Sequence, residues 1–265
     1  MSRPVPLHHT LSGPADAPLL VLGPSLGTSA RVWSAQLPTL ARAFRVLCFD
    51  LPGHGGSATE ALPFTEPGRA TVDDLAELVL DLVARLRHER FHYAGISLGG
   101  AIGARLAADH PGRVASLALV CSSARFGRPD PWRERAALVR SRGMEPVVAT
   151  APGRWFAGSG TAGTPLGRAL LRDLATADPT GYAACCDALA AYDLRPRLGR
   201  ITAPTLVVGG LLDTATPWEH AQELGAGIPR ATVETIGTGH LALEEPRAVT
   251  ELLLAHLGRS TAPSL

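Results

Sequence analysis

The stretch Gly-Ile-Ser-Leu-Gly at residues 95–99 sets a serine between two glycines, at a point where the sequence pattern changes. A short strand-like segment, residues 91–94, precedes it, and the small, helix-forming residues 100–108 follow it. Strand, sharp turn and helix together predict a nucleophile elbow, where side chains in place of the glycines would collide at the bend. Ser97 would then stand at the carboxyl end of a sheet and at a helix N-terminus, which favours developing negative charge. The alternative is a glycine-rich turn whose serine has no role.

The rest of the chain alternates strand-like and helix-like segments. A helix is predicted over residues 71–87, because apolar residues recur there at helical spacing and Thr71 is a fair N-cap. A final helix is predicted over residues 246–257, which begin with proline. This rhythm predicts an α/β fold with a mostly parallel central sheet and helices on both faces. Strand patterns occupy residues 18–22, 44–49, 114–120, 204–209 and 231–236.

The alternation breaks after Cys121. Residues 125–191 are rich in arginine and alanine, a composition typical of helices, and glycine-rich turns interrupt them. The clearest of these turns, residues 158–163, is expected to be a loop. We interpret residues 125–191 as a helical cap over the carboxyl edge of the sheet, inserted into a core formed by residues 1–124 and 192–265.

Composition narrows the classes of function. Hydrophobic residues make up 46% and charged residues 18% of the 265 positions, which is typical of a globular chain of one larger α/β domain. The formal net charge is +1, so neither nucleic acid nor a membrane surface is an expected partner. The sequence shows no apolar leader and no run of about 18 apolar residues, so we expect a cytoplasmic location. The four cysteines form no C-x-x-C pair, so no zinc or redox site is expected.

A serine hydroxyl is a poor nucleophile until an oriented base takes its proton. In chains with this elbow, the acid and then the histidine follow the serine in sequence. Asp213 comes after the strand pattern at residues 204–209, and His240 comes after the pattern at residues 231–236. Both positions lie at the carboxyl edge, where sites in open α/β sheets are built. We therefore predict Ser97, Asp213 and His240 as the catalytic residues.

Other residues compete for the roles of base and acid. Among nine histidines, His54 is the strongest alternative base. It precedes Ser97 in the chain, so it is better explained as stabilising the turn after its own strand. The alternative acids are Asp50, Asp187 and Asp193, of which Asp50 is better explained as a turn former.

A tetrahedral intermediate also needs two backbone N–H groups that point at one oxygen. We expect one from Leu98, directly after the serine, and one from Leu26, in the loop after the first buried strand. That loop, residues 23–28, reads Gly-Pro-Ser-Leu-Gly-Thr, so Pro24 and Ser25 stand where the common H-G-x-G pattern has His-Gly. The alternative is that Leu26 is simply a core leucine.

With these residues placed, the chain resembles the α/β-hydrolases over nearly its whole length, and among them the 3-oxoadipate enol-lactonases of the β-ketoadipate pathway. The stretches in the cap carry the narrower resemblance, because the core motifs are shared across the superfamily. The family often has arginine before the Gly-His-Gly turn, whereas this chain has Leu51-Pro52, which weakens any role for a cation there. The matching stretches are residues 25–28, 32–33, 35–38, 44–47, 49–50, 53–55, 95–100, 154–156 and 178–183.

The resemblance implies hydrolysis of 3-oxoadipate enol-lactone to 3-oxoadipate through an acyl-enzyme on Ser97, with no metal or organic cofactor. The partner would be a small anionic lactone. All 25 basic residues are arginine, so its carboxylate must be held by arginine, histidine or backbone N–H groups. The candidates are Arg125, Arg128, Arg133 and Arg154, with Trp132 and Trp155 as pocket walls; for each arginine the alternative is a solvated helix face.

Three other functions fit the same residues. One is a different hydrolase of small esters or lactones, because substrate choice in this fold is set by the cap and loops. Another is a cofactor-free activity like that of the haloperoxidases. The third is a non-catalytic receptor for small molecules, which an intact set of Ser97, Asp213 and His240 disfavours. A dehalogenase is also disfavoured, because it needs a carboxylate at the position of Ser97.

Overall fold

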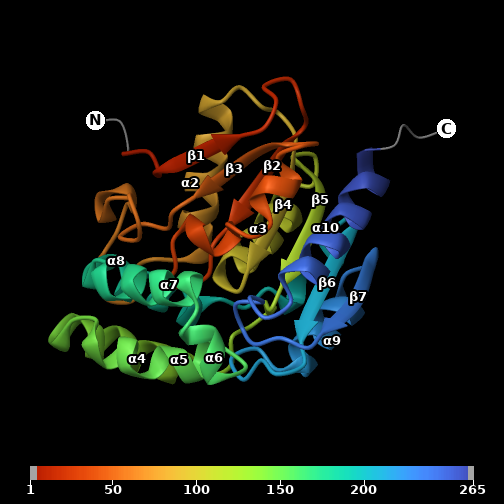
Figure 1. The fold of residues 1–265 in the computed structure, drawn as a ribbon. Coiled ribbons are helices and arrows are strands. Elements are labelled where there is room, and N and C mark those ends of the chain that lie inside the picture. The colour runs from red at the N-terminus through yellow and green to blue at the C-terminus, as the bar shows by residue number, and fades with distance from the viewer. Residues whose placement is uncertain (1–4, 262–265) are drawn as a thin grey trace.

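The structure is a computed structural model that describes residues 5–261 of the chain, and side chains as far as residue 258. A seven-stranded sheet forms its centre, in the order β1-β3-β2-β4-β5-β6-β7 (Figure 1). Neighbouring strands run parallel except β1, which is antiparallel to β3. The strands are β1 (His9–Ser12), β2 (Leu19–Gly23), β3 (Arg45–Phe49), β4 (Phe91–Ile96), β5 (Val114–Val120), β6 (Thr205–Gly210) and β7 (Ala231–Ile236).

The burial of each strand follows its place in the sheet. β2, β4 and β6 are buried along their whole length. Parallel strands that are covered by helices on both faces are buried in this way, and their sequences are rich in apolar residues. The edge strands β1 and β7 instead carry half-buried and exposed residues. The predicted mostly parallel sheet is therefore confirmed, and so are the predicted strands.

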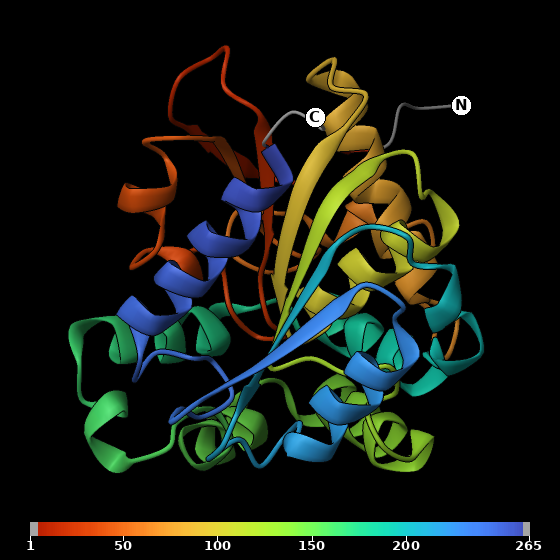
Figure 2. The same ribbon diagram turned by 90° about the vertical axis from the view of Figure 1, so that its right-hand side faces the viewer.

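Helices cover both faces of this sheet. In Figure 2, α1 (Leu37–Leu40) and α10 (Pro246–Thr261) lie on one face, while α2 (Val72–Arg85), α3 (Leu98–Asp109) and α9 (Trp218–Gly227) lie on the other. Three short 3₁₀ helices, η1 (Ala30–Trp33), η2 (Thr59–Ala61) and η3 (Arg195–Arg200), connect these elements. In the described part of the chain, no helix is both long and apolar enough to cross a membrane.

The start of α2 shows how local sequence sets an element. The Thr71 hydroxyl oxygen accepts the N–H of Asp74, and the Asp74 carboxylate accepts the N–H of Thr71. This capping box satisfies two N–H groups that the first turn of a helix cannot. The predicted N-cap is therefore confirmed.

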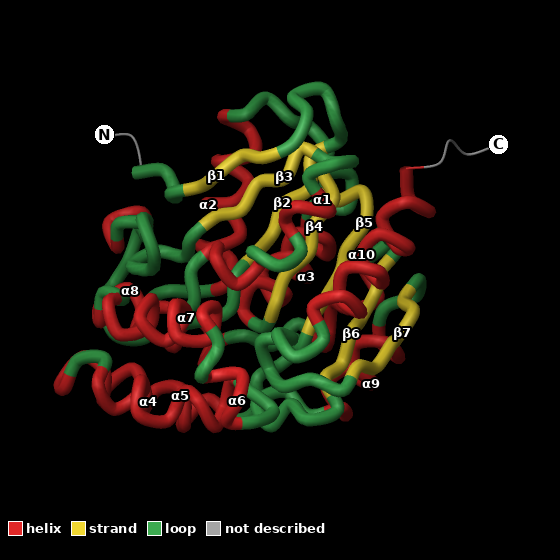
Figure 3. The backbone as a smooth tube through the Cα atoms, viewed as in Figure 1, coloured by secondary structure: helices red, strands yellow, loops and turns green. Residues whose placement is uncertain are grey.

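Five further helices, here called the cap helices, lie between β5 and β6 in sequence and across the carboxyl ends of the strands (Figures 1 and 3). The glycine-rich segment at residues 158–163, expected to be a loop, contains one of them, a single helical turn that begins after Gly158. Glycine at the N-cap position lowers the stability of a helix only slightly, so a glycine-rich composition did not exclude a helical turn here. The cap helices are α4 (Pro129–Arg142), α5 (Glu145–Trp155), α6 (Ser159–Ala162), α7 (Pro165–Thr176) and α8 (Pro179–Ala191).

Helix α8 is fixed to the core by a close approach of two glycines. A Cβ built on Gly181 would lie 2.7 Å from the Cα of Gly53, and one built on Gly53 would lie 2.8 Å from the Cα of Gly181. The N–H of Asp178 donates to the carbonyl of Gly53 at 2.8 Å. Arg140 of α4 forms an ion pair of 2.6 Å with the buried Asp187 of α8, so α4 and α8 are also joined.

Candidate active site

Ser97 occupies a sharp turn between β4 and α3. Its φ is 55° and its ψ is −117°, a conformation that costs free energy in a residue with a Cβ. The turn closes tightly, because a Cβ on Gly95 would overlap the backbone of Gly99, and one on Gly99 would overlap the carbonyl of Gly23. The N–H of Ser97 donates to the carbonyl of Val120 in β5 at 3.0 Å. The elbow predicted from the pentapeptide is therefore present in the fold.

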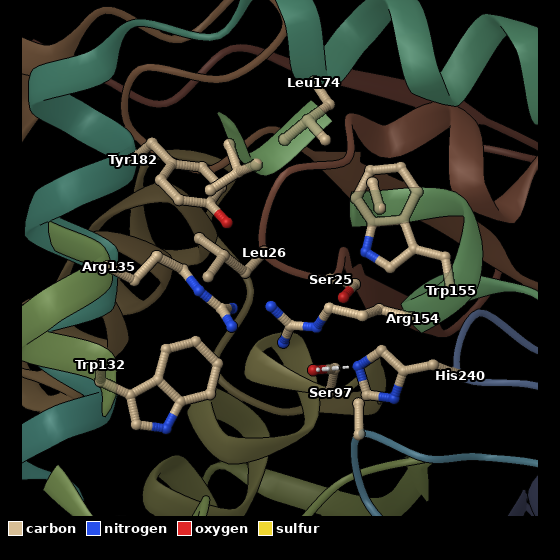
Figure 4. A pocket seen from close by; sticks show the side chains of 13 residues that line it. Ser25, Leu26, Ser97, Trp132, Arg135, Arg154, Trp155, Leu174, Tyr182 and His240 are labelled. Atoms are coloured by element: carbon tan, nitrogen blue, oxygen red, sulfur yellow. Dashed lines mark hydrogen bonds between the residues drawn. The ribbon is translucent and has the colours of Figure 1, made fainter. Parts of the chain in front are cut away.

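Ser97, His240 and Asp213 form a hydrogen-bonded series. Nε2 of His240 lies 2.9 Å from Oγ of Ser97 (Figure 4). Nδ1 of the same ring lies 2.9 Å from Oδ2 of Asp213. All three residues are buried, although they come from segments more than 20 residues apart. With Nδ1–H donating to the carboxylate, Nε2 is free to accept the serine proton.

The loop after β6 holds the Asp213 carboxylate in its ionised form. Oδ1 accepts the N–H groups of Ala215 and Thr216 at 2.8 and 3.0 Å, and Oδ2 accepts the Thr216 hydroxyl at 2.6 Å. Burial raises the pKa of Asp213, but hydrogen bonds from His240 and Thr216 and the attraction of the His240 ring outweigh burial, so the pKa lies below its ordinary value. The carboxylate is thus poised to orient the imidazole and to stabilise its protonated form.

His54, the alternative base, lies in the loop after β3, and its ring contacts the loop after β2. Its Nε2 accepts the N–H of Gly27 at 3.1 Å, and its Nδ1 lies 2.9 Å from the carbonyl of Pro52, a pattern that fits a neutral ring with the proton on Nδ1. Burial lowers the pKa of His54 and outweighs the nearby carbonyl and carboxylates, which favours this neutral form. His54 therefore anchors the loop that carries Leu26, and its ring nitrogens are not directed at Ser97.

The alternative acids are each occupied by other partners. Asp50 accepts the N–H groups of Ala30 and Gly56 and pairs with His8, which fits its interpretation as a turn former. Asp187 pairs with Arg140, and Asp193 pairs with Arg195.

Leu26 and Leu98, the expected N–H donors, flank the serine. Leu98 is the first residue of α3, so its N–H has no acceptor within the helix, and the positive end of the helix dipole lies there. Leu26 lines the same cavity as Ser97 and is only 7% exposed, so its side chain also belongs to the core. The loop of Leu26 is tied at Gly27 by His54, which fixes the direction of its peptide groups.

A cavity between the cap helices and the core opens onto Ser97 and His240. Arg135 and Arg154 project into it with their guanidinium groups turned toward one another (Figure 4). Neither guanidinium forms an ion pair with any side chain of the described residues. Burial, together with the charge of Arg135, lowers the pKa of Arg154. The cavity is lined by Ser25, Leu26, Ser97, Trp132, Arg135, Val147, Ala151, Arg154, Trp155, Leu174, Tyr182, Ala215 and His240.

Three of the predicted substrate-binding residues lie in this cavity: Arg154, Trp132 and Trp155. The other three do not. Arg125 and Arg128 line a separate surface groove beside His220, and Arg133 is exposed and pairs with Asp130. Arg133 thus lies on a solvated helix face, which was the alternative. Arg125 and Arg128 precede the first turn of α4; Arg128 is exposed and Arg125 is half-buried.

Arg135 was missed from the sequence. It lies three residues after Trp132 on α4, and its guanidinium carbon sits 4.6 Å from the centre of the Trp132 ring. Residues three apart share a helix face, whereas Arg133, one residue after Trp132, is turned away by about 100°. Helical spacing from the predicted wall Trp132 was the signal that could have found Arg135.

Comparison with known proteins agrees with the topology. The model of the alpha/beta hydrolase family matches residues 20–252. The chain is 34% identical over 260 residues to 3-oxoadipate enol-lactonase 2 of Acinetobacter baylyi, covering 97% of this chain and 95% of that protein. It is 33% identical over 272 residues to RutD of Variovorax paradoxus, named as a carbamate hydrolase, with coverage of 98% and 99%.

A solved structure extends the likeness to three dimensions. The crystal structure of the enol-lactonase from Burkholderia xenovorans matches with a TM-score of 0.88 at 34% identity, covering 95% of this chain and 96% of that one. The resemblance seen in the sequence is therefore supported across the core and the cap alike. A family match that spans most of the chain, on a sheet and elbow of this topology, establishes that the chain belongs to the alpha/beta hydrolase family.

Proposed function

We propose that this protein is a serine hydrolase that opens 3-oxoadipate enol-lactone to 3-oxoadipate. The observation that carries the proposal is the pair of guanidinium groups, Arg135 and Arg154, that face the same cavity as Ser97 without a carboxylate partner among the described side chains. Two like charges held side by side in a partly buried cavity repel one another, and a bound anion relieves that repulsion. A small lactone with a carboxymethyl arm supplies such an anion.

In the proposed reaction, Oγ of Ser97 attacks the ring carbonyl while Nε2 of His240 takes the serine proton. The N–H groups of Leu26 and Leu98 would bind the oxyanion. The ester C–O bond then breaks, and the enol oxygen leaves as it takes the proton from His240. An enolate is a stabilised leaving group, so this step needs little acid help, and the released enol then tautomerises to a ketone. Water activated by His240 attacks the acyl-enzyme, and the C–O bond to Ser97 breaks to release 3-oxoadipate.

Two arginines match the two carboxylates of the product, one of which the lactone already carries. The lactone carries one carboxylate, and hydrolysis creates a second one at the carbon that Ser97 had held. An arginine paired with a carboxylate away from bulk water makes a charge-assisted hydrogen bond. Trp132 and Trp155 close the sides of the cavity, so the ring is held with its carbonyl at the elbow. The names of the enol-lactonase relatives support this substrate, and that of RutD makes a carbamate the competing one.

Arg154→Ala and Arg135→Ala test the proposal. Each variant is expected to lower kcat/KM for the enol-lactone by roughly 10- to 150-fold, since a hydrogen bond to a charged group contributes about 1.5–3 kcal/mol. A neutral ester of similar size should be hydrolysed almost unchanged. Arg133→Ala is the matched control, because Arg133 lies on α4 with Arg135 but faces solvent.

The measurement is kcat/KM for the enol-lactone, a small carbamate and neutral esters with each purified protein. A wild-type enzyme that prefers neutral esters would replace the enol-lactonase proposal with a general esterase. Preference for the carbamate would replace it with the activity named for RutD. If both cavity arginine variants keep the full preference of the wild type for the anionic lactone, the carboxylate is held elsewhere.

A further inference from the structure

The loop between β7 and α10 carries a half-buried carboxylate, Glu244, which accepts three hydrogen bonds. Its Oε2 accepts the hydroxyl of Thr238 at 2.7 Å and the N–H of Gly239 at 3.1 Å. Its Oε1 accepts the N–H of Ala157 at 2.9 Å. The first two donors belong to the loop of His240, and the third follows the end of α5. One carboxylate therefore joins the histidine loop to the cap helices.

A second hydrogen bond reinforces this link on the other side of the histidine. The N–H of Leu241 donates to the carbonyl of Trp155 at 3.2 Å. The peptide N–H groups of both neighbours of His240 are thus held, one by Glu244 and one by α5. The contact is close as well, since a Cβ on Gly239 would lie 2.5 Å from the backbone nitrogen of Ala157.

The acceptor at this junction is charged. Burial raises the pKa of Glu244, but the hydrogen bonds from Thr238, Ala157 and Gly239 outweigh burial and hold the pKa below its ordinary value. An ionised carboxylate can accept at both oxygens, and such charge-assisted bonds are stronger than neutral ones. An amide of the same shape accepts at one end only and turns N–H groups toward the donors at the other.

We propose that Glu244 is a positioning residue that sets the place of His240 against Ser97 by tying the histidine loop to the end of α5. The proposal rests on the role of His240 as the base in the proposed function. Because α5 also carries Arg154 and Trp155, the same link fixes the distance between the base and the wall of the cavity that receives the substrate.

Glu244→Gln tests this role, with Glu245→Gln as its matched control. Glu245 is the next residue, and its side chain is exposed. Glu244→Gln is expected to lower kcat by roughly 10- to 100-fold, as a small displacement of a catalytic group does, with KM within a few-fold of the wild type. The loss should be equal for the enol-lactone and a neutral ester, because both depend on the base. Glu245→Gln should match the wild type in both constants.

The rate at which a fluorophosphonate labels Ser97 is the second measurement. Labelling requires the hydrogen bond between Ser97 and His240 but no particular substrate. It therefore tests the role of Glu244 even if the wild type does not open the lactone. We expect it to fall in parallel with kcat, at a Tm close to that of the wild type. Unchanged kcat and labelling in Glu244→Gln would overturn the proposal, as would a raised KM with unchanged labelling.

Thr238→Val carries the test if Glu244→Gln fails to fold. It is close to isosteric, removes one of the three donors and leaves the carboxylate bonded to Gly239 and Ala157. We expect kcat and labelling to fall several-fold, less than in Glu244→Gln. A folded Thr238→Val variant with wild-type kcat and labelling would overturn the proposal in that case.

Discussion

Ser97→Ala is expected to abolish turnover while the protein stays folded, with a loss in kcat on the order of 10⁶-fold. The variant lacks the oxygen that would form the acyl-enzyme, so hydrolysis has to proceed by direct attack of water. A residual rate of roughly 10³- to 10⁴-fold over the uncatalysed reaction should remain from the oxyanion donors and from binding. Among the described residues, the Ser97 hydroxyl forms a hydrogen bond only with His240, and the turn is held by neighbouring glycines, so the fold does not depend on the hydroxyl.

This expectation is checked with purified Ser97→Ala protein by steady-state hydrolysis and by fluorophosphonate labelling. Thermal unfolding compares its Tm with that of the wild type, which separates loss of the nucleophile from loss of the fold. Hydrolysis near the wild-type rate would rule out Ser97 as the nucleophile.

His240→Ala is expected to be about as damaging as Ser97→Ala, because nucleophile and base act as one unit. Asp213→Asn should cost less, on the order of 10⁴-fold in kcat, since the imidazole remains but loses the charged partner that orients it. The amide also cannot accept at both of the positions that now receive Ala215, Thr216 and His240. The measurement is kcat for each variant on one substrate, with Tm as the control for folding.

His54→Ala provides the contrast for the base. His54 receives the N–H of Gly27 and holds the loop of Leu26, so its loss should weaken binding of the oxyanion without removing the base. We expect a smaller fall in kcat than for His240→Ala. If His54→Ala were the crippling change and His240→Ala harmless, the hydrogen-bonded series would have been assigned the wrong histidine.

The features that could be predicted from the sequence are those fixed by neighbours in the chain. The elbow at residues 95–99 is a strand, a turn and a helix in direct succession, so its geometry follows from local sterics. Asp213 and His240 each follow a strand of a parallel sheet, and parallel strands bring their carboxyl ends to one edge. The Ser97–His240–Asp213 series and the mostly parallel sheet thus needed little tertiary information.

Arg154 was a candidate from the sequence, but placing Arg135 in the cavity required tertiary information. Whether an arginine of α4 meets substrate or water depends on the rotation of the helix about its axis, which is set by its packing against α8. Ala136 and Val139 are the buried residues of α4, and they turn Arg135 toward the cavity and Arg133 toward solvent. Glu244 was equally hidden, because its role depends on the loop after β7 meeting the end of α5.

The paired glycines between α8 and the core limit how far the cap can move. Because the backbones of Gly53 and Gly181 are in contact, α8 is held against the core. The ion pair of Arg140 with Asp187 holds α4 to α8. We therefore expect the dimensions of the cavity to be fixed before a ligand binds, so that ligands are selected by size. Acyl groups larger than the space between Trp132 and Trp155 would not fit. In a series of esters with increasing acyl chain length, kcat/KM should therefore fall sharply beyond one length.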